Sequence, residues 1–201
     1  MTNPIPTPPT PPAPAAPLTI RRATPGDLMA VLGLLAASAA WMHARGWNAW
    51  APGGFPPERI TPGIAEGTVW LAAEGERPVA TLALDRHPDP EFSGDQALSL
   101  GVGDYLPDAW VLHRLAVSRA RAGQGIGPLL LDWAADRTRR DGGPWLLVNM
   151  ARNAEPLHRW YAAHGFKHIA TITETPRKSG TLCTRPAARV AGLRQHITEI
   201  G

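Results

Sequence analysis

The sequence contains one cysteine, Cys183, and only two lysines, Lys167 and Lys178. With a single thiol no intramolecular disulfide can form, and nothing argues for a secreted, disulfide-stabilised domain. Cys183 lies in the run TLCT, where a buried small side chain is a far commoner interpretation than a nucleophile. No apolar run predicts a membrane span, and the N-terminus lacks the basic head and apolar core of a signal peptide. We therefore expect a cytoplasmic protein.

Long basic runs and clusters of metal ligands are also missing. The formal net charge is only +3, nearly all of the base is arginine, and no basic run predicts a nucleic-acid partner. The histidines at 43, 158, 164 and 168 are scattered without metal-ligand spacing, so no metal is predicted. We therefore expect no nucleic-acid partner and no membrane, and we expect a monomer or a homodimer.

Composition divides the chain into three parts. Residues Met1 to Pro17 are mostly proline, threonine and alanine, a composition that predicts a disordered, polyproline-like tail. Residues 18–186 alternate strand and helix patterns and are expected to form one domain. Residues 187–201 are expected to be a C-terminal tail, and we assign no chemistry to them.

Within the domain the periodicity predicts six strands besides the first, with helices between them. Leu18 to Arg22 is the first strand, and Thr24 and Pro25 begin a helix that Gly46 ends. A short second helix follows near residues 57–67, and a further helix is expected over 153–164. Further strands are expected over 69–73 and 79–84, which form a hairpin, and over 110–117, 145–150, 166–173 and 181–184.

The stretch Ala116 to Arg140 organises the rest of the chain. It passes from an apolar strand through a glycine-rich turn into an amphipathic helix. Gly123, Gly125 and Gly127 allow close backbone approach, and the free N–H groups of a helix N-terminus suit an anion such as phosphate. No Lys-Ser or Lys-Thr follows, so this is not a Walker loop. By itself the turn is equally compatible with a plain strand-to-helix connection.

The wider sequence makes the signal specific. The segment LHRLAVSRARAGQGIGPLLLDWA resembles the acetyl-CoA-binding motif of the GCN5-related N-acetyltransferase (GNAT) superfamily, in which a strand ending in Leu-x-Val precedes a Gln/Arg-x-x-Gly-x-Gly/Ala turn and a helix. Downstream, NAEPLHRWYAAHGFKHI is similar to the second motif of that family. Ala122 departs from the usual Gln or Arg, and Pro128 removes one N–H from the helix start. The resemblance spans about residues 18–186.

The resemblance implies an α/β (α+β) fold. Its central sheet would be mixed and mostly antiparallel, with helices on both faces and with the fourth and fifth strands parallel and splayed. The implied activity is direct transfer of an acetyl group from acetyl-CoA, the co-substrate, to the amine of a small molecule or an amino-acid derivative. The implied cofactor-binding residues are Leu115, Ala116, Val117, Ala122, Gly123, Gln124, Gly125, Ile126, Gly127 and Asn153.

The resemblance also suggests which residues act as the acid and the base of the transfer. Tyr161 occupies the position of the family's tyrosine acid, which protonates the departing thiolate; the alternative is a tyrosine that only packs against the cofactor. His113 is the first candidate for the base, because histidine side chains change charge near neutral pH. A hydrogen-bonded core histidine is the commoner role inside a strand. The weaker candidates for the base are Asp85, Glu91, Asp104 or a water chain.

Two tryptophans could form a wall for the acceptor amine. Trp47 and Trp50 lie in the connection between the first two helices, which overhangs the acceptor site in the family; ordinary packing of a long connection is the alternative.

The sequence leaves two other functions open. One is an acyl-CoA-binding pseudoenzyme or sensor without turnover, and the other is an interaction protein that acts through its proline-rich tail.

Overall fold

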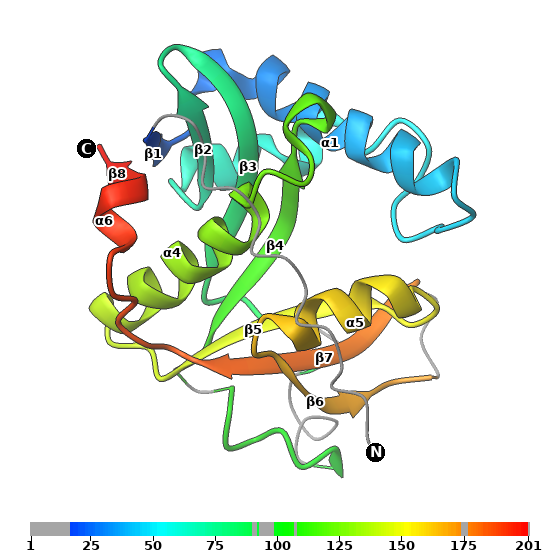
Figure 1. Cartoon of the computed structure of the whole chain (residues 1–201). Helices are drawn as coiled ribbons and strands as arrows, with labels where there is room; N and C mark the ends of the chain where they lie inside the picture. The colour runs from blue at the N-terminus through cyan, green and yellow to red at the C-terminus, as the bar shows by residue number, and fades with distance from the viewer. Residues whose placement is uncertain (1–16, 90–91, 93–98, 107, 174–176, 201) are drawn as a thin grey trace, which may run out of the picture.

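The computed structural model describes residues 17–89, 92, 99–106, 108–173 and 177–200. The expected proline-rich tail lies outside the described residues apart from Pro17, and so does Glu91. Figure 1 shows a central sheet with helices packed against it.

The sheet has eight strands in the order β6-β7-β5-β4-β3-β2-β1-β8. Neighbouring strands are antiparallel except for two parallel pairs, β4 with β5 and β1 with β8. The expected mixed and mostly antiparallel sheet with parallel fourth and fifth strands is thereby confirmed. The strands are β1 (Leu18–Arg22), β2 (Val69–Glu74), β3 (Arg77–Asp85), β4 (Trp110–Val117), β5 (Trp145–Ala151), β6 (Lys167–Thr171), β7 (Ser179–Pro186) and β8 (Ile197–Glu199).

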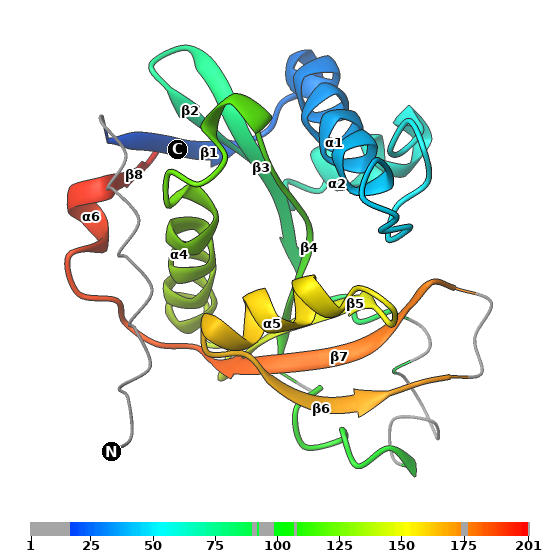
Figure 2. The same ribbon diagram turned by 45° about the vertical axis from the view of Figure 1, so that its right-hand side comes forward.

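Helices cover both faces of this sheet (Figure 2). The pair α4 and α5 packs on one face, where a large apolar cluster includes Trp70 and Trp133 with ring centroids 4.8 Å apart. The pair α1 and α2 packs on the opposite face over a second cluster around Val31 and Leu35. The helices are α1 (Leu28–His43), α2 (Thr61–Ala65), α4 (Ile126–Arg140), α5 (Glu155–Ala163) and α6 (Leu193–His196).

The helix α1 begins later and is more apolar than its sequence pattern predicts. Pro25 to Asp27 form a 3-10 turn, and the Asp27 carboxylate accepts a hydrogen bond from the Thr24 backbone N–H at 2.8 Å, as in a capping box.

The helical stretch Pro25–His43 is long and apolar enough to cross a membrane, with a mean hydropathy of 1.4. The sequence-based expectation that no segment qualifies was therefore wrong. The helix α1 packs against β3 and β4, as the core helix of a folded domain does.

The two strands at the centre separate towards one end. The parallel pairing of β4 with β5 extends only from Trp110 to Leu112 on β4. On the other side of β4 the register with β3 shifts, because Ala83 faces His113 whereas Thr81 faces Ala116. Two β4 residues, Arg114 and Leu115, thus oppose one residue of β3, which is a β-bulge. Within this bulge, Arg114 has a left-handed φ of 50°.

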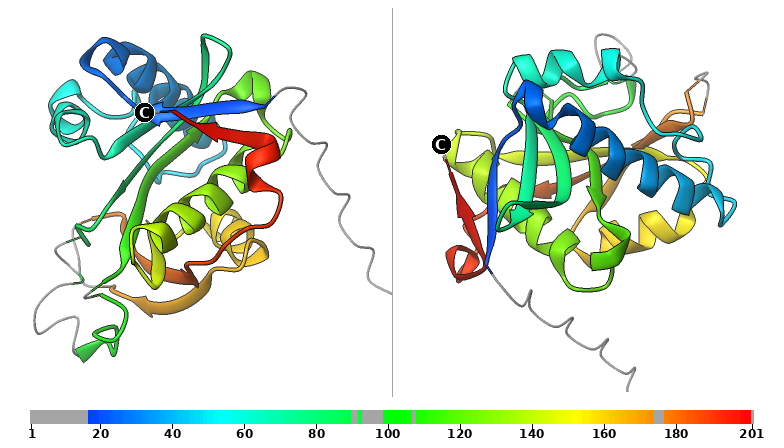
Figure 3. Two further views of the ribbon diagram at one scale, coloured as in Figure 1. Left: turned by 90° about the vertical axis from the view of Figure 1, so that its left-hand side faces the viewer. Right: turned by 90° about the horizontal axis from the view of Figure 1, so that it is seen from above.

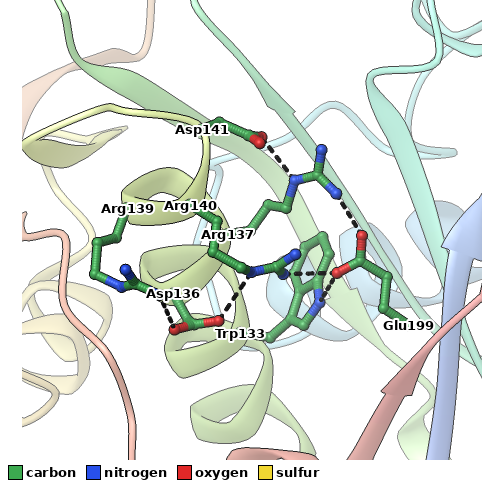
Figure 4. A network of polar contacts seen from close by, with 7 residues as sticks. All are labelled: Trp133, Asp136, Arg137, Arg139, Arg140, Asp141 and Glu199. Carbon is green, nitrogen blue, oxygen red and sulfur yellow. Dashed lines mark hydrogen bonds and ion pairs between the residues drawn. The ribbon is translucent and has the colours of Figure 1, made fainter.

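Residues of the expected C-terminal tail pack onto the domain. The helix α6 buries Leu193, and β8 buries Ile197 while lying beside β1 (Figure 3). Glu199 then connects β8 to α4, because its carboxylate accepts hydrogen bonds from Arg137, from Arg140 at 2.7 Å and from the Trp133 indole at 3.3 Å (Figure 4).

Candidate active site

The separation of β4 from β5 opens a cleft of about 1380 Å³. Its walls come from β4 and β5, the turn before α4, the helix α5 and the connection between α1 and α2. The predicted residues Trp47, Trp50, His113 and Tyr161 all line it, although they are far apart in the sequence.

At one end of the cleft the glycine turn exposes backbone N–H groups. Gly123 and Gly125 have left-handed φ angles of 77° and 78°, and Gly125 is the N-cap of α4. In the described part of the chain, no acceptor is found for the N–H groups of residues 123–127. The first N–H of α4 with a partner is that of Leu129, which bonds to the Gly125 carbonyl at 3.1 Å. Such a turn has the donors and the helix dipole that bind a phosphate.

Trp160 of α5 packs closely over this turn. A Cβ atom added to Gly127 would lie 3.1 Å from the Trp160 ring, so a larger residue would require the ring to move by a few tenths of an ångström. The same ring packs edge-to-face on Tyr161 and lies 4.6 Å from the His164 ring. The aromatic row therefore connects the turn with the middle of the cleft, a role for Trp160 that the sequence analysis missed.

On β4, His113 pairs with an acid on the neighbouring strand. Its Nε2 atom lies 3.4 Å from Oδ1 of Asp85, and the His113 side chain is 19% exposed in the cleft wall. Burial acts to raise the pKa of Asp85, but the hydrogen bond and charge of His113 and the His87 N–H outweigh it, so this pKa lies below its usual value. Two residues predicted as rival bases are thus partners in one acid–imidazole pair.

Tyr161 lies deeper in the same cleft. It is only 8% exposed, and burial raises the pKa of its hydroxyl well above the ordinary tyrosine value, with a further contribution from Cys183. Among the described residues no hydrogen-bond partner of this hydroxyl is found. The hydroxyl is therefore protonated at neutral pH and is available to a ligand as a donor.

The remaining predicted residues divide into two groups. The backbone of residues 115–117 lines the cleft next to the bulge, together with Ala122, Gly123, Gly125, Ile126 and Gly127. Gln124 and Asn153 do not belong to the cleft wall, and Asn153 is exposed in the turn before α5. Asp104 is also exposed and lies outside the wall, so it is poorly placed as a base.

The cleft wall also contains charged residues that the sequence analysis did not identify. Arg119 lies over the Trp41 ring at 4.0 Å, and Arg45 lies over the same ring at 4.2 Å, which connects the end of α1 to the segment before the glycine turn. Burial and the charge of Arg45 lower the pKa of Arg119. Arg121 pairs with Glu74 at 2.5 Å. A helical tryptophan and isolated arginines give no signal of such contacts in the sequence.

Comparison with known proteins agrees with this fold. The model of the acetyltransferase (GNAT) domain matches residues 65–168. The chain is 30% identical over 148 residues to YesJ, an uncharacterized N-acetyltransferase of Bacillus subtilis, covering 71% of this chain and 78% of YesJ.

Solved structures share the fold at lower identity. A GNAT-family acetyltransferase from Listeria monocytogenes superposes with a TM-score of 0.64 at 22% identity, covering 84% of this chain and 94% of the other. YncA from Salmonella typhimurium, solved with its cofactor acetyl-CoA, gives 0.58 at 18% identity, covering 88% and 98%. The fold is that of GNAT-family acetyltransferases. The chain belongs to the GNAT family.

Proposed function

We propose that this protein is an N-acetyltransferase that uses acetyl-CoA to acetylate the amine of a small molecule. One observation carries the proposal. A turn of unpartnered N–H groups, an acid–imidazole pair and a buried tyrosine hydroxyl line a single cleft. Acetyl-CoA bound to YncA, which has the same fold, supports the choice of co-substrate.

The turn suits the pyrophosphate of the co-substrate. Five consecutive backbone positions, 123–127, offer N–H groups at the positive end of the α4 dipole. The close packing of Trp160 on Gly127 fixes the turn, so the donors need little rearrangement on binding. The pairing of β4 with β5 stops at Leu112, and we assign the hydrogen bond to the thioester oxygen to the backbone of residues 115–117 beyond it.

The chemistry needs two proton movements. Bound acetyl-CoA supplies the acetyl group as a thioester, so that the carbon–nitrogen bond to the amine forms as the carbon–sulfur bond breaks. His113 takes the proton that the amine nitrogen loses, and Asp85 stabilises the resulting imidazolium. Tyr161 faces the leaving sulfur and gives it a hydrogen bond or a proton.

The environment of Tyr161 restricts that role. Because burial raises its pKa, complete proton transfer to a thiolate, whose usual pKa is about 8.5, is uphill from this hydroxyl. Tyr161 is therefore a hydrogen-bond donor to the sulfur as its charge develops, and CoA leaves as a thiolate that takes its proton from water. The electrostatic contribution is larger in this buried site than it would be in water.

A thermal-shift experiment with two glycine variants tests the cofactor site. Acetyl-CoA should raise the melting temperature of the wild type by mass action, whereas nicotinamide dinucleotides should not. Gly125→Val should lose that shift, because a β-branched side chain strains the left-handed turn that presents the donors. Gly142→Val is the matched control: Gly142 has a φ of 80° but lies after α4, outside the cleft wall.

Release of CoA thiol with a panel of amines tests the transfer itself. Tight acetyl-CoA binding without release for any amine would favour the sensor without turnover. Equal stabilisation of the wild type and the Gly125→Val protein would show that the glycine turn does not hold the co-substrate.

A further inference from the structure

Two arginines in the cleft wall take no part in the chemistry above. Arg59 ends the 3-10 turn η2 (Pro57–Arg59), and Arg114 occupies the bulge of β4. Both line the cleft. Their guanidinium carbons lie 5.5 Å and 5.4 Å from the centroid of the Phe55 ring, so the two cations flank one aromatic side chain.

Neither guanidinium forms an ion pair with any residue that the structure describes. Arg114 is half-buried, and its burial and the charge of Arg59 lower its pKa. The charges of Asp85 and Asp89 act to raise the pKa of Arg114, but both carboxylates lie beyond ion-pair distance from its guanidinium. A cation withdrawn from water without a counter-ion is costly and is normally paired.

Both of these carboxylates have closer partners. Asp85 is 3.4 Å from His113, and Asp89 is 2.9 Å from Arg177. Asp89 is also the one acidic side chain among the described residues of the cleft wall. The charge left unbalanced on this wall is therefore positive.

The backbone indicates that the position of Arg114 matters. A left-handed φ is uncommon for a residue with a long side chain, and bulges near active sites re-aim side chains. The bulge turns Arg114 onto the α1 face of the sheet, where it lines a small cavity with Val31, Leu35 and Ile60 and its guanidinium lies over the Phe55 ring. Without the extra residue, alternation along β4 would direct this side chain to the α4 face.

This pair is separate from the phosphate-binding end of the cleft. Arg59 and Phe55 belong to the connection between α1 and α2, whereas the free N–H groups of residues 123–127 lie at the start of α4. The cleft thus has a place for negative charge besides the glycine turn, and the co-substrate pyrophosphate does not account for it.

We propose that Arg59 and Arg114 bind a carboxylate of the acceptor, so that the amine to be acetylated belongs to a small amino acid. This inference rests on the proposed function, because it assigns the acceptor for that reaction. The planar guanidinium matches a carboxylate through paired hydrogen bonds. The aromatic side chains Trp47 and Trp50 provide an apolar wall for the rest of the acceptor. A polyamine, in contrast, would meet two uncompensated cations.

Matched acceptors test the assignment. Initial rates of CoA thiol release are measured for a set of amino acids, for their primary amides and for the corresponding amines without a carboxyl group. Rates are compared per unprotonated amine, since the three types differ in amine pKa. We expect kcat/KM to be at least about tenfold higher for the acids than for the amides, as for loss of a charge-assisted hydrogen bond.

Variants then locate the carboxylate. Arg59→Gln should raise KM for the acids more than for the amides and so reduce the preference; Arg59 is exposed, so folding should be preserved. Arg114→Gln should do the same, and Arg114→Lys should restore only part of the preference because it lacks the fork. Arg194→Gln, an exposed arginine of α6 outside the cleft wall, should retain the wild-type preference.

The outcomes separate the two proposals. Equal efficiency on acids and amides, acetylation only of amines without a carboxyl group, or an unchanged preference in the Arg59→Gln protein would each overturn the carboxylate site. The transferase would stand in those cases. If no amine is acetylated, the proposed function fails and the acceptor assignment fails with it.

Discussion

Replacing Glu199 by glutamine should destabilise the whole domain, although Glu199 lies next to the last described residue of the chain. Its carboxylate joins β8 to α4 through Arg137 and Arg140 (Figure 4). Glutamine keeps the length and one acceptor oxygen but removes the charge. The variant therefore tests whether the segment after residue 186 belongs to the folded domain.

The expected loss of stability depends on the exposure of Glu199 and on the other acids that still pair with Arg137 and Arg140 in the variant. Hydrogen bonds to charged groups contribute about 1.5–3 kcal/mol when buried, and exposed ion pairs about 0–1 kcal/mol. Glu199 is 22% exposed, between these cases, and both arginines keep a second acid: Asp141 at 2.6 Å from Arg137 and Asp136 at 3.0 Å from Arg140. We expect a loss of about 1–2 kcal/mol, or roughly 2–8 °C in Tm for a protein of this size.

The pH dependence has a definite sign. Burial acts to raise the pKa of Glu199, but Arg140 and Arg137 outweigh it, so the folded pKa lies below the unperturbed 4.5. The unfolded chain then binds more protons, and the stability from ionised Glu199 is fully present above pH about 4.5 and is lost as pH falls through the folded pKa. The difference between wild type and variant should be constant from pH 7 to 5 and should shrink below 4.5.

Urea unfolding at several pH values measures this difference, with Glu66→Gln as the control. Glu66 is exposed and forms no ion pair with a described residue, so its variant should lie within about 0.5 kcal/mol of the wild type. Equal stability of the Glu199→Gln protein and the wild type at pH 7 would refute the reasoning, as would a difference that persists unchanged to pH 4.

Three further outcomes concern the cleft. Tyr161→Phe should lower kcat by roughly ten- to ten-thousand-fold with acetyl-CoA affinity retained, since the ring remains; an unchanged kcat at saturation would remove the tyrosine from the chemistry. Because burial raises the pKa of Tyr161, wild-type kcat should show no alkaline loss from this group below pH 10. Asp85→Asn should reduce kcat/KM by about tenfold or more while the acetyl-CoA thermal shift persists; a lost shift would indicate a structural role instead.

Much of the secondary structure could be predicted because it depends on local patterns. The strands Leu18–Arg22 and Trp110–Val117 match their predicted bounds, and the helix Ile126–Arg140 begins at the glycine turn. The other predicted elements differ by a few residues at their ends, whereas α6 and β8 fall in the expected tail and were not predicted. Apolar periodicity and glycine positions carry this information along the chain itself.

The arrangement of the cleft depends instead on contacts between distant residues. Asp85 and His113 were predicted as alternative bases, yet the register of β3 and β4 brings them within 3.4 Å. The pair Glu199 and Arg140 is separated by 59 positions, so the last strand gave no local signal. Neither contact is encoded in the spacing of one helix or strand.

Arg114 shows most clearly where local reasoning ends. In the sequence it interrupts an apolar strand, and intrinsic preference would not assign a left-handed φ to an arginine. The extra residue at this position has three consequences at once. It takes β4 out of register with β3, it lies where β4 has parted from β5, and it turns a cation onto the face opposite α4. Strained backbone persists where the surrounding structure compensates its cost. Here the bulge beside the opening between β4 and β5 also carries the charge that we assign to acceptor recognition, so the proposed substrate choice depends on this irregular backbone.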